Sequence, residues 1–250
     1  MIRWLCLWFI ALTTTAAAEE IVLGMDNDTI AITTSFDGSS ILIFGAVKRE
    51  APMKETPLEV IVAVAGPKEQ VEVRRMSRTF GVWANTDRIQ VDAAPSFYAV
   101  ATSNDWDKVI TETEDLRHRI SIPKAIRAVD TKVTDVENFN DALIRIRQNE
   151  QVYSINDGGV LLEDQTLFQT RIFLPAKLTE GDYQTRIFLT RDGLVVSQYE
   201  TTIGVYKAGL EEFLYSMAHE QPFLYAIMSL IIAVAAGWGA SAFFRMVRAS

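Results

Sequence analysis

The chain has 250 residues and a formal net charge of −8, and 49% of its residues are hydrophobic. That apolar content is enough for a folded core and excludes a disordered chain. The only cysteine is Cys6, close to the N-terminus, so the rest of the chain excludes thiol catalysis, cysteine-ligated metal and disulfides.

Residues 1–18 have the pattern of a secretory signal peptide. Arg3 precedes an apolar run from Trp4 to Leu12, and three alanines at 16–18 form an A-x-A cleavage site before Glu19. The run is too short to span a membrane as a mature helix. The alanines favour cleavage over an uncleaved N-terminal anchor, which would give a two-span protein.

Residues 19–102 predict a β-sandwich domain. Short apolar or alternating runs are separated by turn residues, and their spacing is typical of an immunoglobulin-like β-sandwich. The run 58–65 is apolar at both odd and even positions, as expected of a central strand that is buried on both faces. The other expected strands cover 29–33, 40–47, 71–75, 80–84, 88–92 and 96–102.

Residues 103–151 predict a helical insertion of two helices. Ser103 is the expected N-cap of the first, whose apolar face would carry Trp106, Val109, Ile110, Thr113 and Leu116. Glu112, Glu114 and Asp115 would then form a solvated polar face. The second helix is expected at 138–149.

Residues 152–207 predict a second β region, with strands at 160–162, 167–174, 183–190 and 194–205. The segment 178–183 has the L-x-x-G-x-Y pattern of a tyrosine corner, in which the phenol of Tyr183 would bind the preceding loop. Four strands are few for an independent unit. They either complete the first sandwich or form a second small one.

Residues 222–244 predict a transmembrane helix, because the segment has no charged residue and is long enough to cross a bilayer. Before it, 208–221 predicts a juxtamembrane amphipathic helix that either lies on the membrane or a partner, or packs on its own domain. Arg245 and Arg248 lie in the tail 245–250, which the positive-inside rule places in the cytoplasm. The N-terminal domain would then lie outside the cytoplasm.

Charge excludes one class of partner for that domain. Leaving out Arg3, Arg245 and Arg248, the chain has 21 basic residues against 32 acidic ones, a net charge of about −11. Phosphates should repel such a surface, and no clustered basic face is apparent in the sequence. We therefore expect no nucleic-acid partner.

Three small residues, Ala233, Gly237 and Ser241, recur every fourth position in the predicted span. Such a stripe lets a second membrane helix approach closely, although a lone alanine-rich anchor can carry one by chance.

Trp83, Tyr98 and Trp106 are candidates for a ligand groove, or alternatively pack the sandwich against the helices. An enzyme or a sensor would need polar groups that meet in a concave pocket. The candidates for such groups are Asp105, Asp107 and His118. No catalytic residue, cofactor or metal site is predicted.

The chain resembles a family of transmembrane proteins of alpha-proteobacteria. The resemblance depends on segments FGVWANT at 80–86, APSFYAVA at 94–101, RHRI at 117–120, LPA at 174–176, FLY at 213–215 and AHEQP at 218–222. It implies a single-pass protein of the bacterial inner membrane with a periplasmic domain, acting beside a sulfite-exporter-like transporter.

The leading hypothesis is a non-enzymatic, membrane-anchored periplasmic module that binds or supports another integral membrane protein. The alternatives are a periplasmic ligand-binding sensor or envelope enzyme with a carboxylate and aromatic cleft, and a structural component of the envelope.

Overall fold

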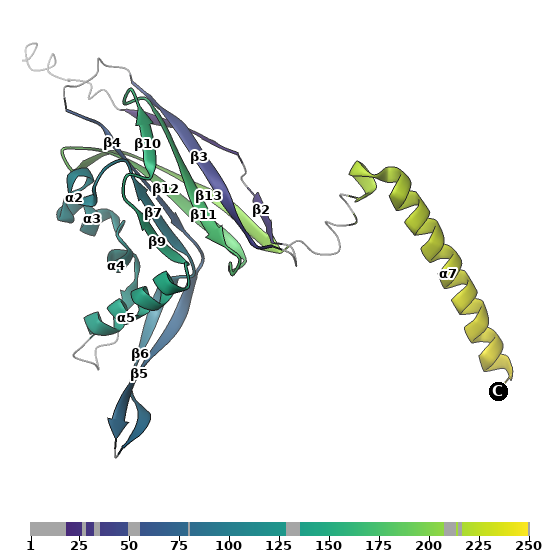
Figure 1. Ribbon diagram of the computed structural model, residues 1–250. Coiled ribbons are helices and arrows are strands. Elements are labelled where there is room, and N and C mark those ends of the chain that lie inside the picture. Colours follow the sequence, from purple (N-terminus) through teal and green to yellow (C-terminus); the bar gives the residue numbers. More distant parts are fainter. Residues whose placement is uncertain are drawn as a thin grey trace, which may run out of the picture. The chain divides into compact units, whose positions relative to one another are not determined.

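The computed structural model describes residues 19–26, 29–32, 36–49, 56–79, 81–128, 136–207, 214 and 217–249 (Figure 1). They form two compact units, one within 1–30 and 36–205 and the other within 31–35 and 206–250. The predicted signal peptide, 1–18, and much of the predicted juxtamembrane helix, 208–221, lie outside the described residues.

The first unit is mainly β, as predicted. A four-stranded sheet has the order β1 (Glu20–Met25), β3 (Gly38–Lys48), β11 (Leu167–Pro175) and β10 (Val160–Glu163). A six-stranded sheet has the order β2 (Thr29–Ile32), β13 (Leu194–Lys207), β12 (Gly181–Arg191), β4 (Glu59–Ala65), β7 (Tyr98–Thr102) and β9 (Tyr153–Asn156). Strand β9 pairs with β7 in parallel, and no strand was predicted there.

Strands from the two β regions of the sequence pair directly. In one sheet β11 is antiparallel to β3, and in the other β12 is antiparallel to β4. The second region therefore completes the same two sheets as the first. The predicted immunoglobulin-like strand arrangement stays a prediction.

Side-chain alternation determines which face of each sheet is buried. Along β11, Phe168, Thr170, Ile172 and Leu174 are buried, whereas the residues between them are exposed. In β4 every residue from Val60 to Val64 is fully buried. This agrees with the prediction from the run 58–65, which is apolar at both odd and even positions. One face of β4 contacts β10 of the other sheet, and α2 packs near it on the helical side (Figure 1).

The predicted tyrosine corner is present. The Tyr183 hydroxyl donates a hydrogen bond to the Thr179 carbonyl oxygen at 2.8 Å, and burial raises the pKa of this phenol to about 12. The bond ties the loop before β12 to the strand.

The first predicted helix is not continuous, so that prediction is wrong. It is two short helices, α2 (Trp106–Val109) and α3 (Glu112–His118), followed by α4 (Ile122–Ala125). The break lies where the Thr111 amide donates to the Gly193 carbonyl in the β12–β13 turn, at 3.0 Å. The second predicted helix is confirmed as α5 (Val136–Asn149).

A long hairpin projects from the sandwich beside α5 (Figure 1). It consists of β5 (Lys68–Thr79) and β6 (Val82–Pro95), and the short β8 (Arg127–Ala128) pairs with β6. Three separate strands were predicted here. Thr79 at the end of β5 pairs with Val82 at the start of β6. Gly81, between them, has a φ of +86°, where a side chain would be strained.

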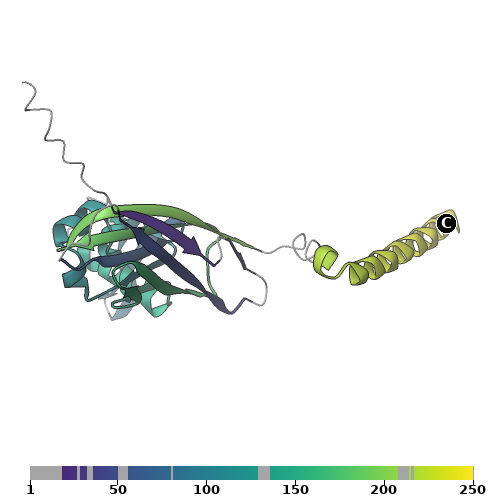
Figure 2. The same cartoon turned by 90° about the horizontal axis from the view of Figure 1, so that it is seen from above.

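The second unit contains α7 (Pro222–Ala249), so the predicted apolar C-terminal helix is confirmed. Its segment Pro222–Ser241 is 20 residues long, has a mean hydropathy of 2.0 and has none of its residues buried. By length and composition this segment can cross a membrane. Seen along a second direction, it is a continuous helix (Figure 2).

Candidate functional site

A cleft of about 690 Å³ lies between the six-stranded sheet and the helices, near the base of the hairpin. This volume lies in the range of small-molecule sites. The sheet and the hairpin contribute Ala65, Lys68, Ala93, Pro95, Tyr98, Gln184 and Arg186. The helical side contributes Arg117, His118, Arg119, Pro123, Lys124, Ala125, Ile126, Arg127 and Asn140. We call it the basic cleft.

Six cationic side chains line the basic cleft, and two of them have carboxylate partners. Arg117 lies 2.5 Å from Glu114, and Lys124 lies 4.0 Å from Glu112. Lys68, Arg119 and Arg127 have no carboxylate within 4.0 Å among the described residues. Cations that are not neutralised, gathered in one concavity of an acidic domain, focus a positive potential there.

Arg186, on β12, connects the sheet to the helical wall. Its guanidinium donates hydrogen bonds to the carbonyl oxygens of His118 at 2.8 Å and Arg119 at 3.0 Å. These carbonyls end α3, where a helix has unpaired acceptors and favours a cation. A third bond, 3.1 Å long, reaches the Tyr98 hydroxyl. Arg186 thus holds the Arg117–Arg119 segment against the sheet.

Asp115 fixes the turn that carries Arg119. Its carboxylate accepts hydrogen bonds from the amides of Ile120 at 3.1 Å and Ser121 at 2.7 Å. The turn needs this support because Arg119 ends α3 in the left-handed region, with a φ of 51°. Asp115 is buried, so the predicted solvated face is wrong at this position.

Glu114 is buried as well, which is a second correction to that face. Besides Arg117, its carboxylate lies 3.5 Å from Nε2 of His118 and accepts the Val195 amide at 3.3 Å. The His118 ring packs edge-on against Phe188, with centroids 5.5 Å apart. Tertiary packing buries these acids because α3 lies with them toward β12 and β13, and it leaves Leu116 exposed instead.

Two neutral groups complete the polar lining. The Tyr98 hydroxyl donates to the Ile120 carbonyl at 2.7 Å, and burial raises the pKa of this phenol, which keeps it protonated. Oδ1 of Asn140 is buried and has no hydrogen-bond partner within the described part of the chain. A buried unpaired amide oxygen is costly, and a ligand that donates a hydrogen bond would satisfy it.

The structure does not bring the three predicted groove aromatics together. Tyr98 lies on the basic cleft, whereas Trp106 lines a separate pocket of about 150 Å³ with Val100 and Ile122. Trp83 lies near the end of the hairpin and is exposed. They separate because β6 continues past Trp83 as one long strand and carries it away from β7.

Of the three polar candidates, only His118 lines the basic cleft. Asp105 instead pairs with Lys108 at 2.8 Å, and this contact raises the pKa of the lysine. Asp107 is exposed. Within the described residues, no cluster of histidine, cysteine, aspartate or glutamate is placed to hold a metal ion.

Sequence reasoning missed most of the cleft's cations. One signal was available: Arg117, Arg119, Lys124 and Arg127 fall within eleven residues of an otherwise acidic chain. No sequence signal marks Lys68 or Arg186, because strand pairing in the sheet and the arrangement of the hairpin bring them to the same place.

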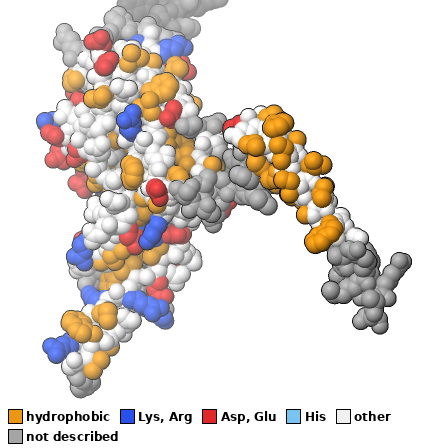
Figure 3. All heavy atoms as spheres, turned by 45° about the vertical axis from the view of Figure 1, so that its right-hand side comes forward, with side chains coloured by type: hydrophobic (Ala, Val, Ile, Leu, Met, Phe, Trp, Pro, Cys, Tyr) orange, Lys and Arg blue, Asp and Glu red, His pale blue; other side chains and the backbone are white. Residues whose placement is uncertain are grey.

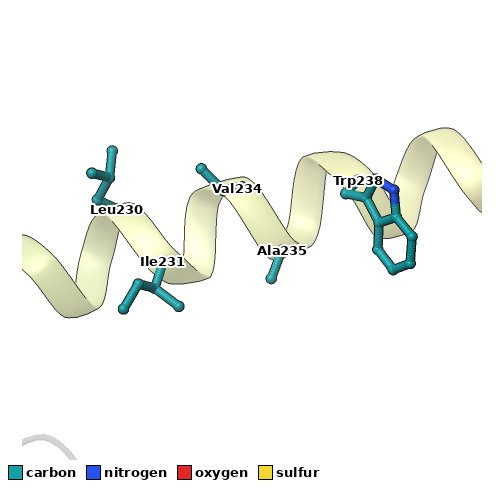
Figure 4. A pocket seen from close by; sticks show the side chains of 5 residues that line it. All are labelled: Leu230, Ile231, Val234, Ala235 and Trp238. Atoms are coloured by element: carbon teal, nitrogen blue, oxygen red, sulfur yellow. The ribbon is translucent and has the colours of Figure 1, made fainter.

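The membrane helix carries the predicted stripe Ala233, Gly237 and Ser241. A side chain at Gly237 would have its Cβ in open space, with no described atom within 4 Å, so this side of α7 is open to a neighbour. A shallow hollow is lined by Leu230, Ile231, Val234, Ala235 and Trp238. Figure 4 shows Leu230 and Val234 on one side of the helix and Ile231, Ala235 and Trp238 on the other. All five belong to one helix, so the hollow is a gap between side chains.

Comparison with known proteins identifies a family. No curated protein matches the chain. A family model described as "Putative transmembrane protein" matches residues 20–246, which include both β regions, the helices of the basic cleft and nearly all of α7. The candidate span Pro222–Ser241 agrees with that description. The chain therefore belongs to this family of transmembrane proteins.

Proposed function

We propose that the protein is a membrane-anchored binding module that takes a small anionic ligand into the basic cleft. The observation behind this proposal is the convergence of Lys68, Arg119 and Arg127, which have no described carboxylate partner, on one cavity of ligand size. Like charges held close together repel each other, and a bound anion relieves that repulsion. Arg117, Lys124 and Arg186 add to the same potential.

The ligand class follows from the lining. Guanidinium groups suit carboxylate and oxyanion groups, to which they donate paired hydrogen bonds. Tyr98, Gln184 and Asn140 add neutral polar groups to the lining. The unpaired Oδ1 of Asn140 would accept a hydrogen bond from a protonated oxyanion. We therefore favour a small oxyanion or carboxylate. The basic cleft differs from the carboxylate and aromatic cleft that the sequence offered as an alternative. The residues expected to line that cleft, Asp105, Asp107, Trp83 and Trp106, lie outside the basic cleft.

Replacing Arg119 with glycine is expected to weaken anion binding without weakening the fold. The change removes one cation from the cleft, while glycine suits the left-handed backbone at a φ of 51°. Loss of one charge-assisted hydrogen bond, about 1.5–3 kcal/mol, corresponds to roughly ten- to a hundredfold in Kd. Isothermal titration of the full chain in nanodiscs with sulfate, sulfite, phosphate and acetate, at constant ionic strength, measures it.

Arg171→Ala is the matched control, because Arg171 lies exposed on β11 in the other sheet. Arg171→Ala removes one positive charge, as the Arg119 variant does, and it should leave the Kd for the anion unchanged. Absence of saturable binding by any of the four anions, or equal loss in both variants, would count against the proposal.

We also propose that α7 packs against another integral membrane protein, and the resemblance suggests a sulfite-exporter-like transporter. The small stripe on α7 supports a close helix contact. In this picture the β body lies in the periplasm.

Gly237→Leu is expected to reduce crosslinking of the chain to its membrane partner in native membranes several-fold, because a leucine side chain keeps the two helices apart. Ala236→Leu, one residue away and on another side of the helix, should retain the crosslink. An equal yield from Gly237→Leu and the unmodified chain would contradict packing through the stripe.

A further inference from the structure

The end of the hairpin exposes large apolar side chains. We call residues 74–79 of β5 and 82–88 of β6 the arm tip; in it Met76 is 59% exposed, Val82 68% and Trp83 64%. Nearer the sandwich, Val73, Ile89 and Val91 of the same strands are buried. The hydrophobic exposure is thus confined to the part of the hairpin that extends farthest.

Cross-strand register arranges these side chains with basic ones. Trp83 lies opposite Arg78, and Met76 lies two residues from Arg78 on the same strand, so all three share one face. Val82 lies on the other face. Hydrophobic and basic side chains accordingly mix toward the end of the arm (Figure 3).

The arm is held firmly at its base. Arg147 of α5 pairs with Glu69, and β8 pairs with β6. At the inner end of the arm tip, the Arg75 guanidinium lies 5.0 Å from the ring centre of Phe139 in α5. A supported hairpin loses little conformational entropy when its tip binds a surface.

Charge distinguishes the arm tip from the rest of the domain. It contains four arginines and one acid, Asp87, whereas the whole segment 19–221 has a net charge of about −11. Asp87 pairs with Arg75 at 2.8 Å, and Glu72, just before the arm tip, lies 3.0 Å from Arg74 and 3.9 Å from Arg88. The arm tip and Glu72 together still have two more basic than acidic residues. An anionic surface that repels the body would therefore attract the arm tip.

We propose that the arm tip binds the anionic headgroup surface of the bilayer that holds α7. Tryptophan prefers the membrane interface, and arginines close to an anionic bilayer are attracted to its headgroups. The segment 208–221 between the β body and α7 has 14 residues, which reach at most about 50 Å when extended. This tether keeps the lipid surface at a high effective concentration, so a weak contact suffices.

The test uses the full chain with a spin label at the arm tip. Cys6→Ser removes the only cysteine, and Val82→Cys then takes a nitroxide. In nanodiscs containing 30% phosphatidylglycerol, the nitroxide should become more accessible to oxygen and less accessible to a nickel chelate, as expected of a label in the lipid. The ratio of the two accessibilities should rise several-fold over that in pure phosphatidylcholine. It should fall again with added Arg78→Glu or with 0.5 M salt.

Leu194→Cys, at an exposed aliphatic residue of β13, is the matched labelling site and should stay accessible to the chelate in both lipids. Unchanged thermal unfolding of each variant shows that the fold is retained. A tip label equally accessible to the chelate in both lipids overturns the proposal. So does a label shielded only in native membranes, since that outcome assigns the arm tip to a protein partner.

Discussion

Replacing Arg186 with glutamine is expected to weaken anion binding by at least tenfold and to lower the free energy of unfolding by about 2–4 kcal/mol. The change removes one cation from the basic cleft. It also removes the donors to the carbonyls of His118 and Arg119 and to the Tyr98 hydroxyl. Glutamine is too short and has too few donors to replace all three bonds.

Arg186→Lys separates the two effects. Lysine keeps the charge but lacks the planar fork that reaches several acceptors, so affinity should fall less than stability. Titration calorimetry gives the first quantity, and thermal unfolding of the chain in mild detergent gives the second. An Arg186→Gln protein with the stability of the unmodified chain would show that this arginine does not hold α3 to the sheet.

Glu19→Ala is expected to lower the free energy of unfolding by about 3–5 kcal/mol, because it leaves a buried charge without its partner. Arg191 is 5% exposed, and its guanidinium donates to Glu19 at 2.6 Å and 3.3 Å. Arg49 adds a third contact to the same carboxylate, at 3.2 Å. Chemical denaturation followed by near-ultraviolet circular dichroism measures the loss.

The same carboxylate predicts a pH dependence. Burial tends to raise the pKa of Glu19, but hydrogen bonds and charge from Arg191 and Arg49 outweigh it and lower the pKa below 4.5. A lowered pKa means that the stabilisation is complete above pH 4.5 and is lost as the pH falls through the folded-state value. The difference in stability between the unmodified chain and Glu19→Gln should therefore be constant near neutral pH and shrink in acid.

The double variant Glu19→Leu, Arg191→Met is the control for this pair. Apolar replacement of both partners leaves no unpaired charge, so it should destabilise the fold less than Glu19→Ala does. Additive losses from the two sites would contradict a coupled ion pair.

Local patterns predicted most of the strands correctly. The apolar run 58–65 became the central strand β4, and L-x-x-G-x-Y gave the Tyr183 to Thr179 hydrogen bond. The helix expected at 138–149 is α5. These features depend on neighbours within a few residues, so side-chain periodicity and turn residues are enough to predict them.

The basic cleft and the hairpin arm were not predictable in this way. Arg186 reaches the end of α3, 67 and 68 residues earlier in the chain, only because β12 pairs with β4 beneath the helices. Glu114 and Asp115 appeared solvated because their helix was treated in isolation, and packing buried both.

The sequence by itself determined that this is a mainly β, acidic, nearly cysteine-free chain ending in an apolar helix long enough to span a bilayer, because composition and periodicity are local properties. Only the tertiary structure decided that the two β regions share both sheets, and that cations from β5, α3, β8 and β12 meet in one cleft. Long-range strand pairing brings those residues together, and no property of a single segment encodes it.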